Sequence, residues 1–403
     1  MLPGGDLLTD EVAGTTFADR VDVNVWRGGQ LVAPTVDDPL DVTSWSLDWD
    51  ADRQVQGQGT FVFADPDGVW APWGMGDPLA PGGSRAQLAW VSGAPSGPTA
   101  GLRVPLDWWR LRRASPDEQW RLRRRGGRVE LVPGGGSVTV RADELTCIPA
   151  QIDRLDAEGQ PPAGATCLSE VRRLLADIMP VVVTAGVSDR PVPSSLVYGE
   201  GRMDAVEDLL SHVDAVHRMA GDGSLQVLPS TLGDPVWTID SGQDGTLVRL
   251  SRELSDEGVY NAVTSRGTSA AGDPLAGRAR LEHGPLRWGV SAPFGRAPAF
   301  HQSIAQTPDG VQADARTRLR TLTTTGQVDL PVVCLTHPGV QLHDAVVVVA
   351  ATLAGDAPLV GRVVRKQIRS AGPVPAKSMA LSVRVTVDAL EAVAARVRGV
   401  RRG

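Results

Sequence analysis

Large side chains alternate with polar ones near the start of the chain, and this pattern constrains the fold more than any other feature. Trp45, Leu47 and Trp49 are separated by single polar residues. A period of two is that of a strand with one buried face. Nine of the eleven tryptophans fall within the first 120 residues, between glycine-rich turns. The sequence therefore predicts a sheet that buries large flat side chains.

Residues 20–157 read as consecutive short strands joined by turns. Gln54–Phe63 is a second alternating stretch, and it runs into the turn-forming residues Asp65–Gly68. Further along, Leu102–Leu111 is expected to pair with Gln119–Arg124, with Asp117 and Glu118 at the tip. Arg128–Val132 is expected to pair with Ser137–Arg141 across a glycine-rich turn. Many short strands with this spacing are typical of a barrel or sandwich.

Residues 158–234 change character and predict a small α/β domain. Glu158–Ala165 reads as a linker, after which Leu168–Ile178 carries apolar residues at helical spacing with Thr166 as its N-cap. A second helix is expected from Met203 through Val216, closing near Gly221. Short strands at 181–184 and 224–228 alternate with these helices.

The strand pattern returns over residues 235–388, interrupted by one helix at Asp309–Thr323. We expect a second barrel there, a short helix with a basic tail over residues 389–403, and an N-terminal arm over residues 1–19. The predicted fold class is α+β, mainly β, with two tube-like β-barrel domains flanking the small α/β domain. No sequence repeat relates the two strand-rich regions.

Composition narrows the classes of function. The formal net charge of −7 argues against a dedicated nucleic-acid binder, whose phosphate contacts need a basic surface. The three cysteines show neither metal-binding nor paired spacing: Cys147, Cys167 and Cys334. We expect them to be buried as small apolar residues, and their number and spacing suit a reducing compartment. No apolar run approaches the roughly 18 residues of a membrane span, and no secretory signal is visible. We expect synthesis in the cytoplasm and no membrane insertion.

Candidate metal and cofactor motifs are incomplete. Asp48, Asp50 and Asp52 imitate the opening of an EF-hand loop, but Arg53 and Gly59 stand where that loop needs glycine and an acidic ligand. The pair His212 and His217 is expected on one helix, five residues apart, and so on different faces. Gly199 and Gly201 open a helix as phosphate-binding loops do, but Asp204 stands where the third glycine is needed. Walker-type, nucleophile-elbow and zinc-protease motifs are absent. We predict no catalytic residue, no metal and no cofactor, with a tail-associated cell-wall hydrolase as one alternative.

A stretch of the chain between Trp108 and Arg128 is rich in arginine and tryptophan. Eight arginines from Arg110 to Arg128 interleave with Trp108, Trp109 and Trp120. This mixture suits single-strand nucleic-acid binding, and it also suits a protein interface, because arginine and tryptophan are enriched in binding hot spots. We expect an assembly interface and keep a nucleic-acid-binding hairpin as the other alternative. The predicted interface residues are Trp108, Trp109, Arg112, Trp120 and Arg123.

The order of features along the chain resembles the tail hub, or minor tail, proteins of actinobacterial phages, relatives of baseplate hubs and tail-tip hubs. Five stretches carry the likeness: Ser46–Asp50 leading into Gln54–Phe63, Leu196–Tyr198 before Arg202–Val206, Asp222–Leu225, Val259–Val263, and Phe294–Arg296 followed by the 309–323 helix and a His-Pro-Gly turn. Together they span about residues 20–390. None is an invariant catalytic signature.

The resemblance implies a homotrimer shaped as a short cylinder, in which two tube-like barrels per chain give six per ring. Such a ring would dock a three-fold tip on the six-fold tail tube and line the path of ejected DNA. Implied partners are the tail tube or distal tail protein, the tape measure protein, and spike, fibre or other tail-tip proteins. Genomic DNA would pass without specific binding. The implied location is the virion tail tip, after assembly in the host cytoplasm. The chain ends at Gly403 without the C-terminal enzymatic or fibre-like extension of longer relatives, which favours a non-enzyme.

Overall fold

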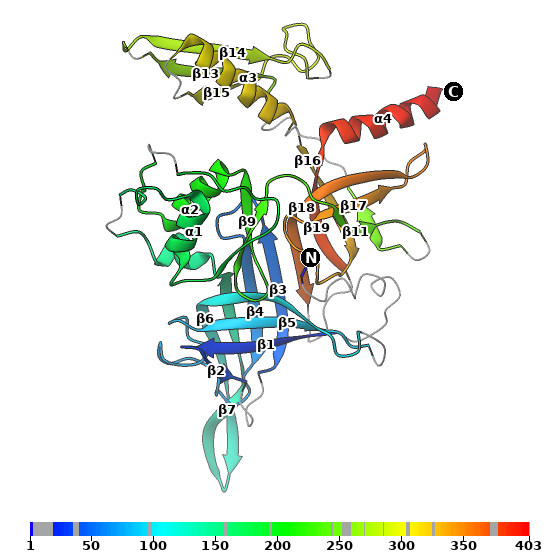
Figure 1. Cartoon of the computed structure of the whole chain (residues 1–403). Coiled ribbons are helices and arrows are strands. Elements are labelled where there is room, and N and C mark those ends of the chain that lie inside the picture. Colours follow the sequence, from blue (N-terminus) through cyan, green and yellow to red (C-terminus); the bar gives the residue numbers. More distant parts are fainter. Residues whose placement is uncertain are drawn as a thin grey trace. The chain divides into compact units, whose positions relative to one another are not determined.

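The computed structural model describes residues 1–2, 19–34, 40–94, 99–156, 159–192, 196–242, 245–251, 259–269, 271–284, 286–303, 307–324, 327–370 and 378–402 (Figure 1). The chain divides into two compact units. The first comprises Met1–Leu250, Pro331–Ala351 and Val360–Val383, and the second Ser251–Leu330, Thr352–Leu359 and Arg384–Gly403. Strands make up 45% of the structure and helices 16%, which confirms a mainly β fold. Most of the predicted N-terminal arm lies outside the described residues.

The N-terminal strands form one half of a large sheet. They are β1 (Arg20–Arg27), β2 (Gln30–Ala33), β3 (Val42–Asp50), β4 (Gly57–Ala64), β5 (Arg85–Val91), β6 (Arg103–Arg125) and β7 (Arg128–Glu144). Alternation on β3 buries Trp45, Leu47 and Trp49 as predicted. Trp49 packs edge-on against Trp109, with ring centroids 5.5 Å apart. Gly59 keeps space for this core, because a Cβ there would lie 3.1 Å from the Phe61 ring.

The C-terminal strands continue the same sheet. They are β11 (Pro235–Ile239), β12 (Leu247–Leu250), β16 (Gln327–Leu335), β17 (Ala345–Ala350), β18 (Ala357–Ser370) and β19 (Ser378–Thr386). The strand order is β12-β16-β19-β18-β3-β4-β7-β6-β5-β1-β2, with β17 pairing to both β11 and β18. β3 and β18 are antiparallel, with Leu47 opposite Ile368. The described strands therefore form an open sheet across both strand-rich regions rather than two closed barrels, because the strand order ends at β12 and β2 and these two strands do not pair with each other.

The α/β part of the first unit contains α1 (Cys167–Leu175), β8 (Val181–Val183), α2 (Arg202–His212), β9 (Ala215–Met219) and β10 (Leu225–Pro229), preceded by a short π-helix at Ile148–Ile152. The three strands are ordered β8-β10-β9. The predicted N-cap is confirmed: Thr166 and Ser169 form a capping box. The predicted extent of the second helix is wrong. Asp214 has a φ of 53°, which ends the helix, and the following residues pair with β10 as β9.

The second unit contains its own small sheet, β14-β13-β15, formed by β13 (Ala262–Thr268), β14 (Pro274–Arg280) and β15 (Pro298–Gln302). Helix α3 (Pro308–Thr324) confirms the helix predicted at 309–323. Helix α4 (Val387–Arg402) continues through the residues expected to form a basic tail. The three cysteines are free and buried, as predicted. None of the described helices is both long and apolar enough to cross a bilayer.

Candidate assembly interface

Strands β6 and β7 form a long two-stranded hairpin that extends beyond the rest of the sheet (Figure 1). Arg125 lies opposite Arg128 across Gly126 and Gly127, whose φ values of 58° and 80° suit a two-residue hairpin turn. The predicted tip at Asp117 and Glu118 is therefore wrong. Two glycines that accept positive φ form the turn, while Asp117 and Glu118 lie within β6 opposite Ser137 and Gly136.

The predicted pairing of Arg128–Val132 with Ser137–Arg141 is also wrong, because both segments lie in β7 and pair with β6. The glycine-rich stretch between them stays inside the strand. A register shift at Gln119 and Trp120 accommodates it.

The outer part of the hairpin has two different faces, because residues directly opposite each other in antiparallel strands share a face. Leu122 lies opposite Leu131, and Arg123 lies opposite Glu130. One side, here called the apolar face, presents Trp120 (58% exposed), Leu122 (73%), Val129 (56%) and Leu131 (65%). The other, here called the arginine face, presents Arg121, Arg123, Arg125 and Arg128. A cluster of large apolar side chains this exposed makes the hairpin a candidate contact surface.

The structure separates the five predicted interface residues. Trp109 is fully buried and packs in the core, so its indole is not available at a surface. Trp108 is half-buried, 6.1 Å from the Trp26 ring. Arg112 is half-buried too, and it donates to Gln151 at 2.9 Å. Trp120 and Arg123 lie on the outer hairpin, on opposite faces.

Sequence reasoning missed Leu122, Val129 and Leu131 as members of this surface. Their alternation with arginines around Gly126-Gly127 was the available signal, since period-two patterns flanking a two-glycine turn predict a hairpin.

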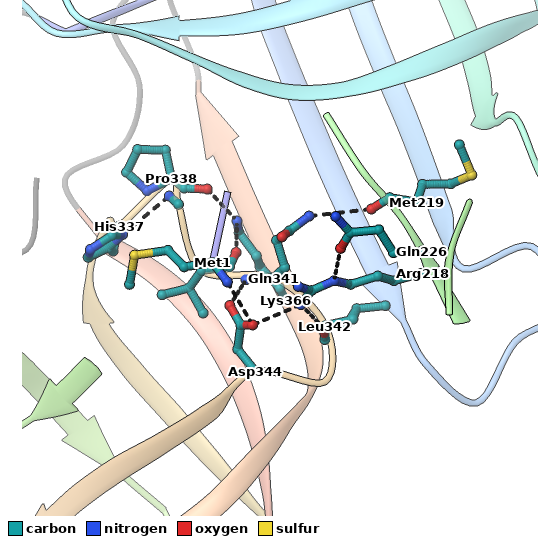
Figure 2. Close-up of polar contacts among 12 residues, drawn as sticks. Met1, Arg218, Met219, Gln226, His337, Pro338, Gln341, Leu342, Asp344 and Lys366 are labelled. Atoms are coloured by element: carbon teal, nitrogen blue, oxygen red, sulfur yellow. Dashed lines mark hydrogen bonds and ion pairs between the residues drawn. The ribbon is translucent and has the colours of Figure 1, made fainter. Parts of the chain in front are cut away.

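A buried polar cluster lies elsewhere in the first unit (Figure 2). Asp344 accepts hydrogen bonds from the Met1 ammonium at 2.9 Å, Arg218 at 2.8 Å and the Gln341 backbone at 2.9 Å. Lys366 donates to the carbonyl oxygens of Pro338, at 2.9 Å, and Val340. These contacts join the N-terminus and β9 to the loop before β17 and to β18, which lie more than 100 residues further along the chain.

Burial is the largest single influence on the pKa values in this cluster, and it sets the direction of the shift at Lys366 and Asp107. It lowers the pKa of Lys366 to about 7, although Asp344 and Asp107 favour the charged form. Burial alone would raise the pKa of Asp344, but Arg218 and the Met1 ammonium outweigh it and lower that pKa overall. Burial and then Glu144 raise the pKa of Asp107 well above its ordinary value. Pairs of perturbed groups can mark an active site, so the space around them decides the interpretation.

That space is too small for a substrate. The cavity bordered by Trp49, Asp107, Glu144, Arg218 and Lys366 measures about 20 Å³, enough for a single water molecule. Every charged group around it is held by neighbours in the same unit. The cluster therefore links β9 of the small sheet to β18 and to the loop before β17, and the cavity beside it is too small for a bound substrate.

A larger hollow of about 650 Å³ lies beside α2 and is lined by Glu207, Ser211, His217, Ser230 and His343, among others. His217 Nε2 lies 3.6 Å from Glu207 Oε1. Burial lowers the pKa of His343 to about 3, so this imidazole stays neutral. Among the described contacts, no hydrogen bond joins either serine to either histidine.

The predicted placement of His212 and His217 on one helix is wrong, since His217 lies on β9. Within the part of the chain that the structure describes, no group of three or more histidine, cysteine or acidic residues could hold a metal ion. Among the described residues that line the hollow, no serine is hydrogen-bonded to a histidine as a nucleophile–base pair would be.

Three solved structures superpose on nearly the whole chain. A tail protein from Neisseria meningitidis MC58 is 16% identical, covering 91% of this chain and 96% of its own, with a TM-score of 0.56. The 43 kDa tail protein of prophage MuSo2 from Shewanella oneidensis is 11% identical, covering 92% and 99%, with a TM-score of 0.55. Prophage tail protein gp18 from Listeria monocytogenes EGD-e is 12% identical, covering 95% and 100%, with a TM-score of 0.50.

The chain has the fold of these tail proteins. No protein-family model and no curated protein sequence matches it. The likeness lies in the backbone arrangement, because sequence identity is low in all three cases.

Proposed function

We propose that this chain is a structural component of a phage tail, the hub at the tail tip or baseplate. The observation that carries the proposal is the tail-protein fold shared over more than nine tenths of both chains with the Neisseria and Shewanella proteins. The tail-protein fold and the absence of room for a substrate at the buried cluster both favour a non-enzyme. The hub position within the tail and the actinobacterial phage origin are parts of the proposal that rest on the sequence resemblance alone.

In the proposed assembly three copies form a ring, and the two strand-rich halves of each chain supply six tube-like segments that match the six-fold tail tube. Two features support contacts between copies. The end strands of the main sheet, β2 and β12, each keep one edge without a partner strand among the described residues, and such edges favour further pairing. The exposed hairpin supplies an apolar surface.

Trp120 and Arg123 on the outer hairpin are the members of the predicted interface that we retain as direct contacts. Trp108 and Arg112 support the base of the hairpin in this proposal. The neighbours would be the tail tube or distal tail protein, the tape measure protein and a spike or fibre protein. Genomic DNA would pass through the ring without specific binding, and the ring would be built in the host cytoplasm and carried at the tail tip.

Mass photometry and negative-stain microscopy of the purified protein test the proposal. The expected result is a ring with three-fold symmetry and a mass near 128 kDa, three times the 42.5 kDa of one chain. A monomer at every concentration, together with absence from tail preparations of particles that carry the gene, would contradict it.

The variant Leu122→Asp/Leu131→Asp tests the role of the hairpin. It places charge on the apolar face and is expected to weaken ring formation without unfolding the subunit. The matched control is Leu232→Asp/Leu353→Asp, which alters two exposed leucines outside the hairpin and should leave the ring intact. Equal effects of the two variants would remove the hairpin from the interface.

A further inference from the structure

The small sheet of the second unit is covered on one face by α3. Val263 and Ala279 on that face are buried against Ala315 and Leu319 of the helix. Helix α3 and strand β14 approach each other closely at Gly277, where a Cβ would lie 2.4 Å from the Val311 carbonyl oxygen. Buried residues alternate along β13 and β14, so the residues between them point to the opposite face.

That opposite face is rich in arginine. Arg278 and Phe300 both lie opposite Thr264, and Arg266 lies opposite Ala276 and Gln302. Arg280 follows on the same face. The three arginines are exposed, and Phe300 is 66% exposed. No aspartate or glutamate lies on this face of the three described strands.

Aromatic rings accompany the guanidinium groups. Arg266 lies over the Phe300 ring at 5.2 Å, and Arg280 and Arg296 lie over the Trp288 ring at 5.4 Å and 5.8 Å. Together with Arg278, these three arginines and two aromatic residues are called the arginine–aromatic face. Within the described part of the chain none of its arginines forms an ion pair with a carboxylate. In a chain with a net charge of −7, this is a local concentration of uncompensated positive charge.

The chemistry of this face suits a nucleic-acid strand. Guanidinium groups bind phosphates, and exposed aromatic rings and guanidinium planes stack on bases irrespective of sequence. Arg278 and Arg280 are two residues apart on one strand, so their Cα atoms lie about 6.5 Å apart, which is comparable to the spacing of successive phosphates in an extended single strand. A stable protein interface would need a hydrophobic centre. Phe300 is the one large, well-exposed apolar side chain on this face of the described strands.

We propose that the arginine–aromatic face binds single-stranded nucleic acid, with the arginines on the phosphates and Phe300 stacked on a base. This site is separate from the hairpin and goes beyond the tail role proposed above. It does not depend on how the two units are arranged.

Fluorescence anisotropy of the full chain with a labelled oligothymidylate of about 12 nucleotides tests the proposal. Four phosphate contacts predict a slope of about −3 when the logarithm of the affinity is plotted against the logarithm of the salt concentration. The affinity should therefore fall roughly 50-fold between about 50 and 200 mM salt. The variant Arg266→Gln/Arg278→Gln/Arg280→Gln should reduce the slope to about −1. Phe300→Ala should weaken binding about 10-fold and leave the slope unchanged. Circular dichroism melts verify that these exposed substitutions leave the fold intact.

The matched control removes three exposed arginines from the hairpin that are not among the retained interface contacts. The variant Arg121→Gln/Arg125→Gln/Arg128→Gln has the same net charge as the face variant and should bind the oligonucleotide like the wild type. Loss of binding in the hairpin variant, with binding retained in the face variant, would overturn the proposal and assign nucleic-acid binding to the hairpin. Equal competition by polyglutamate of the same length would also overturn it, since the face would then select negative charge alone. No binding at low salt would end it outright.

Discussion

Lys366→Met is expected to remove a pH dependence of stability between pH 7 and 9. Lys366 is 3% exposed, and burial lowers its pKa to about 7 from an ordinary 10.5. In this window the unfolded chain binds more protons at this site than the folded chain, so folding becomes more favourable as pH rises. One pKa unit corresponds to about 1.4 kcal/mol. Titration of Lys366 should therefore raise the free energy of unfolding of the wild type by about 2 kcal/mol from pH 7 to pH 9.

Urea unfolding followed by tryptophan fluorescence at pH 7, 8 and 9 measures this gain. The methionine variant should give a flatter profile, whatever its absolute stability, because Met does not titrate. Arg113→Met removes an exposed cation from β6 and should keep the wild-type slope. The reasoning is refuted if the wild-type free energy of unfolding does not rise between pH 7 and 9, or if Lys366→Met retains the rise.

Other substitutions separate buried from exposed roles. Asp344→Ala leaves Arg218 and the Met1 ammonium without their carboxylate and should lower the free energy of unfolding in urea by about 3–5 kcal/mol. Glu200→Ala, which removes an exposed partner of Arg154, should lower it by no more than about 1 kcal/mol. Trp109→Ala should destabilise the subunit by about 3–5 kcal/mol, whereas Trp120→Ala should leave thermal stability nearly unchanged and weaken ring formation; the opposite order would contradict their assigned places. Because Arg218 and the Met1 ammonium hold the pKa of Asp344 below its ordinary value, the stability from Asp344 is present above pH 4 and lost as pH falls further, so acid titration of Asp344→Asn should show a smaller loss than the wild type.

Local patterns predicted the local structure well. The alternation of Trp45, Leu47 and Trp49 identified a strand with one buried face, and Thr166 identified the start of α1, because each signal depends on neighbouring residues alone. The helix α3 followed from its apolar spacing. The resemblance to tail hub proteins predicted a tail-protein fold, and the similar solved structures have that fold.

Predictions failed where a long-range partner decides the structure. Residues 215–219 have apolar spacing compatible with a helix, yet pairing with β10 makes them a strand. The pairing of β3 with β18 joins segments more than 300 residues apart in sequence, and no local pattern encodes it. The same holds for Asp344, Arg218 and Lys366, whose contacts exist only in the folded chain.

The predicted interface mixed core and surface residues for a related reason. Trp109 and Trp120 belong to the same arginine- and tryptophan-rich stretch, and only the extent of the sheet beneath β6 buries one and exposes the other. The composition identified the segment as unusual, but only the folded structure shows which of its residues are buried and which are exposed.

A cryo-electron microscopy map of the tail tip of particles assembled with this chain tests the central claim most directly. The account predicts three copies of this fold around the tail axis, with β6 and β7 of each copy in contact with a neighbouring chain and the apolar face of the hairpin buried. A tail tip without density for this fold, or copies whose hairpins all point into solvent, would contradict it.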